Sequence, residues 1–313
     1  MELVMCRINR ERWEEITAGA FRGEVLFEEP MRNHTSLRIG GPADILSFPY
    51  DFATLIEMIS VLRRFEIPFY PVGGGTNILV KDGGVEGVVI SLRSFRETGV
   101  SGEDKENVYV IVEAGTRLQQ LIRYSRENGY SGIEGLAGIP GTVGGAICGN
   151  AGAFGYEMKD VIEEVSVLDS SGRVLRLPSA DLGFGYRKSN IPHQALILQT
   201  RIRLRKDRKE EVGSRIDDFL KKKKQTQPIW EPSAGCVFKN PPGMAAGKLI
   251  DEAGYKGMSF GSVSVSTVHA NFFISKGQAS ASDFIGLMQM VTAGVHERFG
   301  VSLEPEIRII GRD

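Results

Sequence analysis

The sequence predicts an α+β protein of two domains. Its 313 residues are enough for roughly two domains of about 150 residues each. Between residues 40 and 205, short apolar or alternating segments outnumber segments with helical spacing, which predicts many strands and few helices. A highly charged stretch, 205–227, interrupts this pattern and predicts a helix that leads into a second, smaller α+β domain.

The first domain is predicted to cover residues 31–210, in two lobes of about 31–95 and 96–210, after an N-terminal extension, 1–30. The extension contains an amphipathic helix from Arg10 to Phe21. Apolar residues at helical spacing predict further helices over 52–65 and 116–128. The sequence D-S-S-G at 169–172 predicts a hairpin turn. The predicted strands are 44–48, 67–72, 78–80, 88–92, 108–113, 161–169, 174–177 and 195–204.

The second domain is predicted to cover residues 211–313. A turn that carries Cys236 occupies 232–242 and precedes a helix over 246–253. A strand over 271–274 and a long helix over 282–299 follow. The last predicted strand, 303–310, carries Glu304 and Glu306.

Glycine recurs every two to four residues between Gly132 and Gly155, and most residues between the glycines are small or apolar. Each glycine costs backbone entropy on folding, so such a stretch needs a compensating use. One use is the close approach of backbone N–H groups to a large phosphorylated ligand. The alternative is a tightly packed Gly/Ala turn inside a core. We favour the ligand.

A second glycine run, G-G-G-T-N at 73–77, directly follows a predicted strand. It is neither G-x-G-x-x-G nor a P-loop, so an anion site and a tight turn between strands are equally good interpretations. Together with 132–155, it could hold the two ends of one extended nucleotide.

Charge, cysteine and histidine patterns exclude several classes of protein. A formal net charge of −1 argues against a protein that coats nucleic acid. Three widely spaced cysteines predict a reducing compartment and no structural zinc, and the four histidines show no metal-binding spacing. We find no apolar region typical of a signal peptide and no run long enough to span a membrane, so we expect a cytoplasmic protein.

Arg187, Cys236 and Glu306 are candidates for a reactive centre, because each lies in a segment otherwise suited to packing. Each also has a structural alternative: a surface ion pair, a small buried side chain and an outward-facing carboxylate, respectively. The four lysines Lys221 to Lys224 end a predicted helix, where a solvated end is the default and a contact to a diphosphate is the alternative.

Eight motifs in order make the sequence similar to the UDP-N-acetylenolpyruvoylglucosamine reductase family over about residues 31–311. They are N-H-T-S-L-R-I-G-G-P-A-D, P-V-G-G-G-T-N-I-L-V, G-I-P-G-T-V-G-G-A-I, N-A-G-A-F-G, F-G-Y-R-K-S, P-S-A-G-C-V-F-K-N-P, A-G-K-L-I-D-E-A-G-Y-K-G and L-E-P-E-I-R-I-I-G. The resemblance implies a two-part FAD-binding domain of the vanillyl-alcohol oxidase/PCMH type and a C-terminal domain for a UDP-sugar.

The resemblance also implies roles for individual residues. Arg187 and Glu306 match the pair that handles the enolpyruvyl carboxylate, and Cys236 stands where many members have the serine that donates a proton. Lys224 and Asn240 match substrate contacts. The residues that match the two flavin-binding turns are Gly73, Gly74, Gly75, Thr76, Asn77, Gly138, Ile139, Pro140, Gly141, Thr142, Val143 and Gly144.

The implied reaction uses NADPH to reduce FAD, which then reduces the enolpyruvyl sugar to UDP-N-acetylmuramate for peptidoglycan. Arg187 offers a planar fork for a carboxylate that gains charge, and a thiol at Cys236 can give a proton. The short spacing from Arg187 to Cys236 resembles the subclass without an inserted tyrosine loop. Within 259–271, His269 is the candidate that covers the sugar instead.

Two other interpretations remain open. An oxidase of small alcohols from the same flavin group would use O2 and need no carboxylate clamp. A nucleotide-binding scaffold would have kept the fold without catalysis. The sequence does not give the oligomeric state, although a monomer is compatible with it.

Overall fold

The computed structural model describes residues 8–169, 171–192 and 195–313. In these ranges the chain forms two compact units that interleave along the sequence, each with its own hydrophobic core. Unit 1 comprises 8–27, Ile45–Gly74 and Gly87–Lys222, and unit 2 comprises Glu28–Asp44, Gly75–Glu86 and Lys223–Asp313. The predicted domain boundaries after residues 30 and 210 stay a prediction, because a division into compact units does not show which residues bind the flavin or the substrate.

Capping residues mark the ends of several helices. Asp51 caps α2 through the Thr54 N–H, and Gly129 and Gly300 end α3 and α7 in the left-handed conformation. The helices are α1 (Arg10–Thr17), α2 (Phe52–Arg64), α3 (Leu118–Asn128), α4 (Val143–Cys148), α5 (Lys209–Thr226), α6 (Ala246–Glu252), α7 (Ala281–Phe299) and the 3-10 helices η1 (Met31–Asn33), η2 (Glu134–Leu136), η3 (Met158–Asp160) and η4 (Ser179–Leu182).

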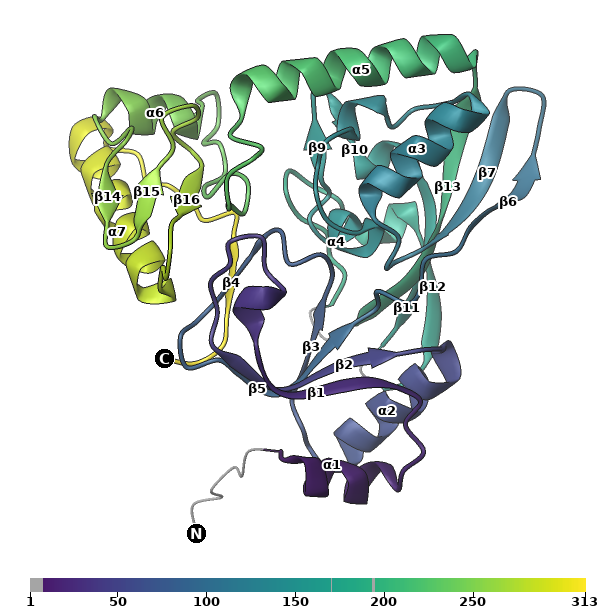
Figure 1. Cartoon of the computed structure of the whole chain (residues 1–313). Helices are drawn as coiled ribbons and strands as arrows, with labels where there is room; N and C mark the ends of the chain where they lie inside the picture. The colour runs from purple at the N-terminus through teal and green to yellow at the C-terminus, as the bar shows by residue number, and fades with distance from the viewer. Residues whose placement is uncertain (1–7, 170, 193–194) are drawn as a thin grey trace. The chain divides into compact units, whose positions relative to one another are not determined.

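Among the described residues, the strands form two larger sheets and three small ones; Figure 1 labels most of these strands. One larger sheet has the order β1-β2-β5-β3, and the other has the order β12-β11-β13-β7-β6, with β8 paired to β13. The small sheets are β10-β9, β14-β15-β16 and β17-β4. The strands are β1 (Gly23–Pro30), β2 (Pro42–Pro49), β3 (Phe69–Val72), β4 (Ile78–Val80), β5 (Val85–Ser91), β6 (Thr98–Glu103), β7 (Asn107–Glu113), β8 (Tyr130–Ser131), β9 (Gly152–Ala153), β10 (Tyr156–Glu157), β11 (Ile162–Leu168), β12 (Val174–Pro178), β13 (Leu196–Lys206), β14 (Ser259–Phe260), β15 (Val263–Val265), β16 (Phe273–Ser275) and β17 (Arg308–Ile310).

In unit 1, the short helix α4 is hydrogen-bonded to the end of β7, in the antiparallel sheet that also contains β13. The N–H of Gly144 donates to the carbonyl of Ala114, directly after β7, and the N–H of Ala114 donates to Leu198 of β13. A Cβ on Gly144 would lie 2.9 Å from the Cβ of Ala114, so glycine permits this close approach. The α+β prediction, with strands in the majority over 40–205, is confirmed.

In unit 2, α7 contacts both the β14-β15-β16 sheet and α6 (Figure 1). Phe273, Phe284 and Phe238 are almost fully buried in its core. The parallel pair β17-β4 brings the C-terminal residues beside Ile78–Val80, which directly follow Asn77. The glycine run at 73–77 thereby leads into a strand that is fixed by the last residues of the chain.

Several predicted elements differ from the structure in extent. The first helix ends at Thr17 rather than Phe21, because Ala18 and Gly19 adopt left-handed conformations. The predicted strand 303–310 is wrong before Arg308, because Pro305 has no N–H to donate and makes only an isolated bridge to Phe238. The segment 143–148, for which no helix was predicted, is α4, since contacts with β7 and β13 outweigh the low helix propensity of glycine.

Seven strands were not predicted, namely β1, β6, β8, β9, β10, β14 and β15, and all of these except β1 and β6 are only two or three residues long. The other predicted helices and strands are present, with ends that shift by a few residues. The antiparallel pairing of β11 with β12 confirms the predicted hairpin, although Ser170 in its turn lies outside the described residues.

Candidate functional site

The two predicted glycine turns meet inside unit 1. A Cβ on Gly74 would lie 2.8 Å from the Cα of Gly141, and one on Gly73 would lie 2.4 Å from the Oγ1 of Thr142. Thr142 in turn caps α4 by accepting from the N–H of Gly145. Glycine is therefore required at 73 and 74 so that the two turns can touch.

The end of the first turn belongs to unit 2. Gly75 has φ +64, and a Cβ there would collide with the carbonyl oxygen of His34 at 2.0 Å. The Nδ2 of Asn77 donates to the Glu306 carbonyl at 3.2 Å, and the N–H of Arg308 donates to the Asn77 carbonyl at 3.1 Å. Asn77 thus fixes the segment that carries Glu306.

A buried hydroxyl lies beside the second turn. Thr116 is 2% exposed, and its Oγ1 has no hydrogen-bond partner among the described residues. The Thr116 carbonyl accepts from the N–H of Val143, the first residue of α4. A buried polar atom of this kind fits a site whose remaining polar groups come from a ligand or water.

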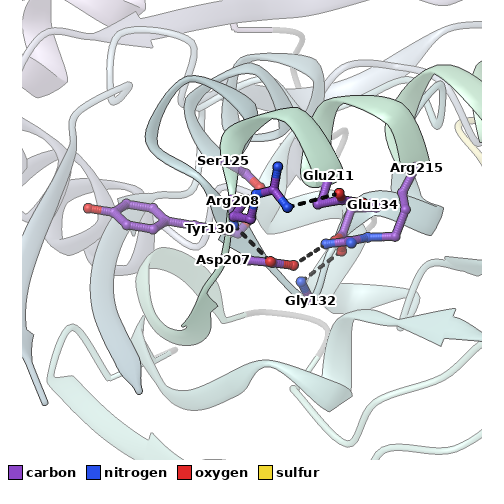
Figure 2. A network of polar contacts seen from close by, with 8 residues as sticks. All are labelled: Ser125, Tyr130, Gly132, Glu134, Asp207, Arg208, Glu211 and Arg215. Atoms are coloured by element: carbon purple, nitrogen blue, oxygen red, sulfur yellow. Dashed lines mark hydrogen bonds and ion pairs between the residues drawn. The ribbon is translucent and has the colours of Figure 1, made fainter. Parts of the chain in front are cut away.

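An ion-pair network anchors the chain ahead of the second turn (Figure 2). Glu134, whose side chain is 1% exposed, accepts from the N–H of Gly132 at 2.7 Å. Arg215 of α5 donates to Glu134 at 2.8 and 2.9 Å and to Asp207 at 2.5 Å. Burial alone would raise the pKa of Glu134, but the Gly132 N–H, its own backbone and Arg215 hold that pKa below its ordinary value. No local pattern predicted this network, because Glu134 is distant in the sequence from both Asp207 and Arg215.

Arg187 occupies a strained position in a tight turn of unit 1. Gly185 and Lys188 exchange backbone hydrogen bonds, so Tyr186 and Arg187 are the two central residues. Arg187 has φ +55, a conformation that glycine adopts at lower cost. Its Nη2 donates to the carbonyl of Gly152 at 2.9 Å. An arginine in a conformation that glycine adopts at lower cost indicates a use for the guanidinium.

Cys236 and Glu306 are brought together by backbone pairing in unit 2. The N–H of Glu306 donates at 2.8 Å to the carbonyl of Val237, the residue after Cys236. Asn271 holds the same segment, because it accepts from the Phe238 N–H at 3.0 Å and donates to the Phe238 carbonyl at 2.7 Å. The Cys236 side chain is partly buried.

The three candidate substrate residues have different environments. Lys224 is exposed, whereas its neighbour Lys223 is 3% exposed, so the default of a solvated lysine run does not hold at Lys223. The Oδ1 of Asn240 accepts from the N–H of Ala246 at 2.9 Å, at the start of α6. Burial lowers the pKa of His269, whose Nδ1 accepts from the Asn271 N–H at 3.2 Å.

Within the described ranges, no three His, Cys, Asp or Glu side chains are arranged to hold a metal ion. Over the same ranges, no helix is long and apolar enough to cross a bilayer.

Two family models match the chain in succession. Residues 43–178 match an FAD binding domain, and residues 227–310 match the C-terminal domain of UDP-N-acetylenolpyruvoylglucosamine reductase. These matches confirm the predicted two-part FAD-binding domain, followed by a smaller C-terminal α+β domain.

Curated proteins and solved structures resemble the chain over most of its length. Two relatives named UDP-N-acetylenolpyruvoylglucosamine reductase come from Caldanaerobacter subterraneus and Geotalea uraniireducens. The first is 42% identical and covers 92% of this chain and 94% of its own; the second is 41% identical and covers 94% and 97%. A crystal structure of the reductase from Thermus caldophilus has a TM-score of 0.79 at 36% identity, over 93% of this chain and 99% of that chain. Physcomitrella patens BBE-like 1 shares the fold at a TM-score of 0.50 and 18% identity, over 62% of this chain and 44% of that chain.

Proposed function

Because the chain belongs to the UDP-N-acetylenolpyruvoylglucosamine reductase family, we propose that it reduces the enolpyruvyl group of UDP-N-acetylglucosamine enolpyruvate to UDP-N-acetylmuramate. The family is one of FAD oxidoreductases that act in peptidoglycan precursor synthesis. The observation that carries the proposal is the 42% identity over 92% of the chain, with both domain matches in order.

The residues present fit an FAD group. Glycines 73 and 74 allow the two turns to touch, and the buried Thr116 hydroxyl beside the second turn is free to bond a ligand atom or water. In this proposal, the turns 73–77 and 138–144 hold the FAD, and NADPH is the reductant. Bound FAD would supply a hydride to the terminal vinyl carbon of the substrate.

Arg187 is proposed to bind the substrate carboxylate. As hydride arrives at the vinyl group, negative charge develops on the adjoining carbon and its carboxylate. A guanidinium can donate two parallel N–H bonds to that group, and these strengthen as the charge grows. Fixing Arg187 in a strained turn, with one N–H group on the Gly152 carbonyl, lowers the reorganisation needed at that moment.

Cys236 is proposed to deliver the proton to that carbon, and Glu306 to share a hydrogen bond at the substrate carboxylate. Two bare carboxylates would repel each other, so Glu306 acts protonated or through a shared proton. The backbone bond from Glu306 to Val237 supports a joint role, because it ties the two segments together. The proton transfer needs a positioned acid, which a partly buried thiol can be.

The rest of the proposal concerns the substrate and its surroundings. Lys224, Asn240 and His269 contact the UDP-sugar, His269 as a neutral imidazole. Residues 31–210 act as the flavin domain and 211–313 as the substrate domain. The enzyme acts in the cytoplasm, because three widely spaced cysteines suit a reducing compartment. Its proposed partners are NADPH and the UDP-sugar, and a monomer is compatible with this function.

The anaerobic half-reactions test this function. The purified protein should show flavin absorption, lose it on addition of NADPH without oxygen, and regain it on addition of the enolpyruvyl sugar. If colour returned only with air, the oxidase interpretation would replace the reductase one. A protein that binds no flavin would instead be the scaffold.

A further inference from the structure

Asn150 lies at the end of the glycine-rich stretch and is fully buried. Its Nδ2 donates to the carbonyl of Gly185 at 3.0 Å and to the Oε2 of Glu157 at 3.1 Å. Its Oδ1 accepts from the N–H of Lys159 at 3.0 Å. Both hydrogens of the amide are therefore used. Asparagine also tolerates the left-handed φ of +40 at this position better than most residues.

The bond to Gly185 reaches the turn that presents Arg187. Gly185 pairs with Lys188 across that turn, so Asn150 grips it at its base, two residues before Arg187. On the other side, the Oγ of Ser189 donates to the Cys148 carbonyl at 2.9 Å. The turn is thus tied at both ends to residues 148–150.

The same amide organises the charges around the guanidinium. Arg187 donates to Gly152, two residues after Asn150, and a Cβ on Gly152 would lie 3.4 Å from the Nη1 of Arg187. Burial alone would raise the pKa of Glu157, but its bonds to Lys159 and Asn150, and then the charges of Lys159 and Arg187, lower it. Lys159 pairs with Glu157 at 2.6 Å, so this carboxylate is held by two partners other than Arg187.

We propose that Asn150 is a positioning residue for Arg187: its amide fixes the Gly185–Lys188 turn and the Glu157 carboxylate so that the guanidinium faces the substrate carboxylate. The inference rests on the role of Arg187 in the proposed function. Without the amide, the Gly185 carbonyl and the Glu157 carboxylate each lose a donor in a partly buried place, and the turn can relax. A displacement of about 1 Å at a reacting group can cost about 100-fold in rate.

The test is single-turnover kinetics of the flavin-loaded protein with Asn150→Gly, which removes the side chain while its backbone conformation stays allowed. Reoxidation of the reduced flavin by the enolpyruvyl sugar should slow about 10- to 100-fold, whereas reduction by NADPH should change less than about threefold. In an Arg187→Ala background, adding Asn150→Gly should slow reoxidation by no more than about twofold, because the group it positions is gone.

Two further variants separate positioning from folding. Asn150→Asp keeps the shape and the acceptor for Lys159 but loses the hydrogens given to Gly185 and Glu157, so it should share the defect. Thr200→Val removes a different buried hydrogen bond of unit 1, from Oγ1 to the Glu164 carbonyl at 2.8 Å, and should leave both half-reactions unchanged.

The outcomes distinguish this inference from the proposed function. If Arg187→Ala reoxidised as fast as the parent, the role of Arg187 would be wrong, and the inference with it. If Arg187→Ala were slow but Asn150→Gly were not, or if the two effects simply multiplied, only the inference would be overturned. It would also be overturned if neither Asn150 variant bound FAD, since the amide would then serve the fold as a whole.

Discussion

Replacing Arg215 by methionine should destabilise unit 1 far more than the loss of an ordinary surface ion pair. The change keeps most of the apolar stem but leaves the Glu134 carboxylate, 1% exposed, with no cation. Breaking a fully buried pair from one side costs about 3–5 kcal/mol. Because the Arg215 side chain is 36% exposed, water already screens part of the attraction, and about 2–3 kcal/mol is the better expectation.

A matched control is an exposed ion pair made to the same helix, α5. Arg126 of α3 makes a two-bond ion pair with Asp217 of α5, at 2.7 and 2.9 Å, but these side chains are 45% and 57% exposed. Arg126→Met should therefore cost about 0–1 kcal/mol. For a folding unit of this size, these losses of stability correspond to a fall in Tm of about 5–10 °C for Arg215→Met and of at most about 4 °C for Arg126→Met.

Thermal unfolding followed by circular dichroism, at a fixed excess of FAD, measures both changes. Adding Glu134→Gln to Arg215→Met should recover part of the loss, because a neutral amide oxygen can still accept from the Gly132 N–H. Equal Tm values for Arg215→Met and Arg126→Met would refute the reasoning, as would a double variant less stable than Arg215→Met alone.

The difference in Tm between the parent and Arg215→Met should depend on pH in a definite direction. The folded-state pKa of Glu134 lies below its unfolded value, so the stability it contributes is complete above the unfolded pKa of about 4.3. That contribution is lost as the pH falls through the folded-state pKa. The gap in Tm between the parent and Arg215→Met should therefore narrow in acid and stay constant near neutral pH.

Three further predictions concern the proposed site. Cys236→Ser should keep much of the activity, whereas Cys236→Ala should slow reoxidation of the flavin by the enolpyruvyl sugar at least about 100-fold. Alkylation of the Cys236 thiol should inactivate the enzyme. An alanine variant as fast as the parent in single turnover would exclude the proton-donor role. Gly74→Ala should weaken FAD binding about tenfold or more in a fluorescence titration, because its methyl group would lie 2.8 Å from the Cα of Gly141; unchanged affinity would show that the turns can separate at no cost. Burial lowers the pKa of His269, so an NMR titration of the imidazole should give a value below 6.5. The contribution of the neutral ring to stability is therefore complete at neutral pH and is lost as the pH falls through the folded-state pKa. A pKa above 6.5 would contradict a buried, neutral ring.

Local sequence pattern was enough to predict the long helices and strands. The apolar spacing of α2, α3 and α7 and the alternation of β7 are local properties, so these elements were predicted within a few residues. Pattern failed where a contact distant in the sequence decides. The helix α4 forms in a glycine-rich segment because Thr142 caps it and because the carbonyl of Ala114 accepts a hydrogen bond from the N–H of Gly144.

By itself, the sequence determined the longer helices, most of the longer strands, the two glycine turns and the family, because each depends on residue types at fixed local spacing. Only the tertiary structure decided which groups meet: Gly74 with Gly141, Glu306 with Val237, and Asn150 with Gly185. These pairs join residues tens of positions apart, and their bonds arise only when packing removes both partners from water. No local spacing encodes such a meeting, which is why the sequence did not identify the partners of Glu134, Asn150 and Asn271.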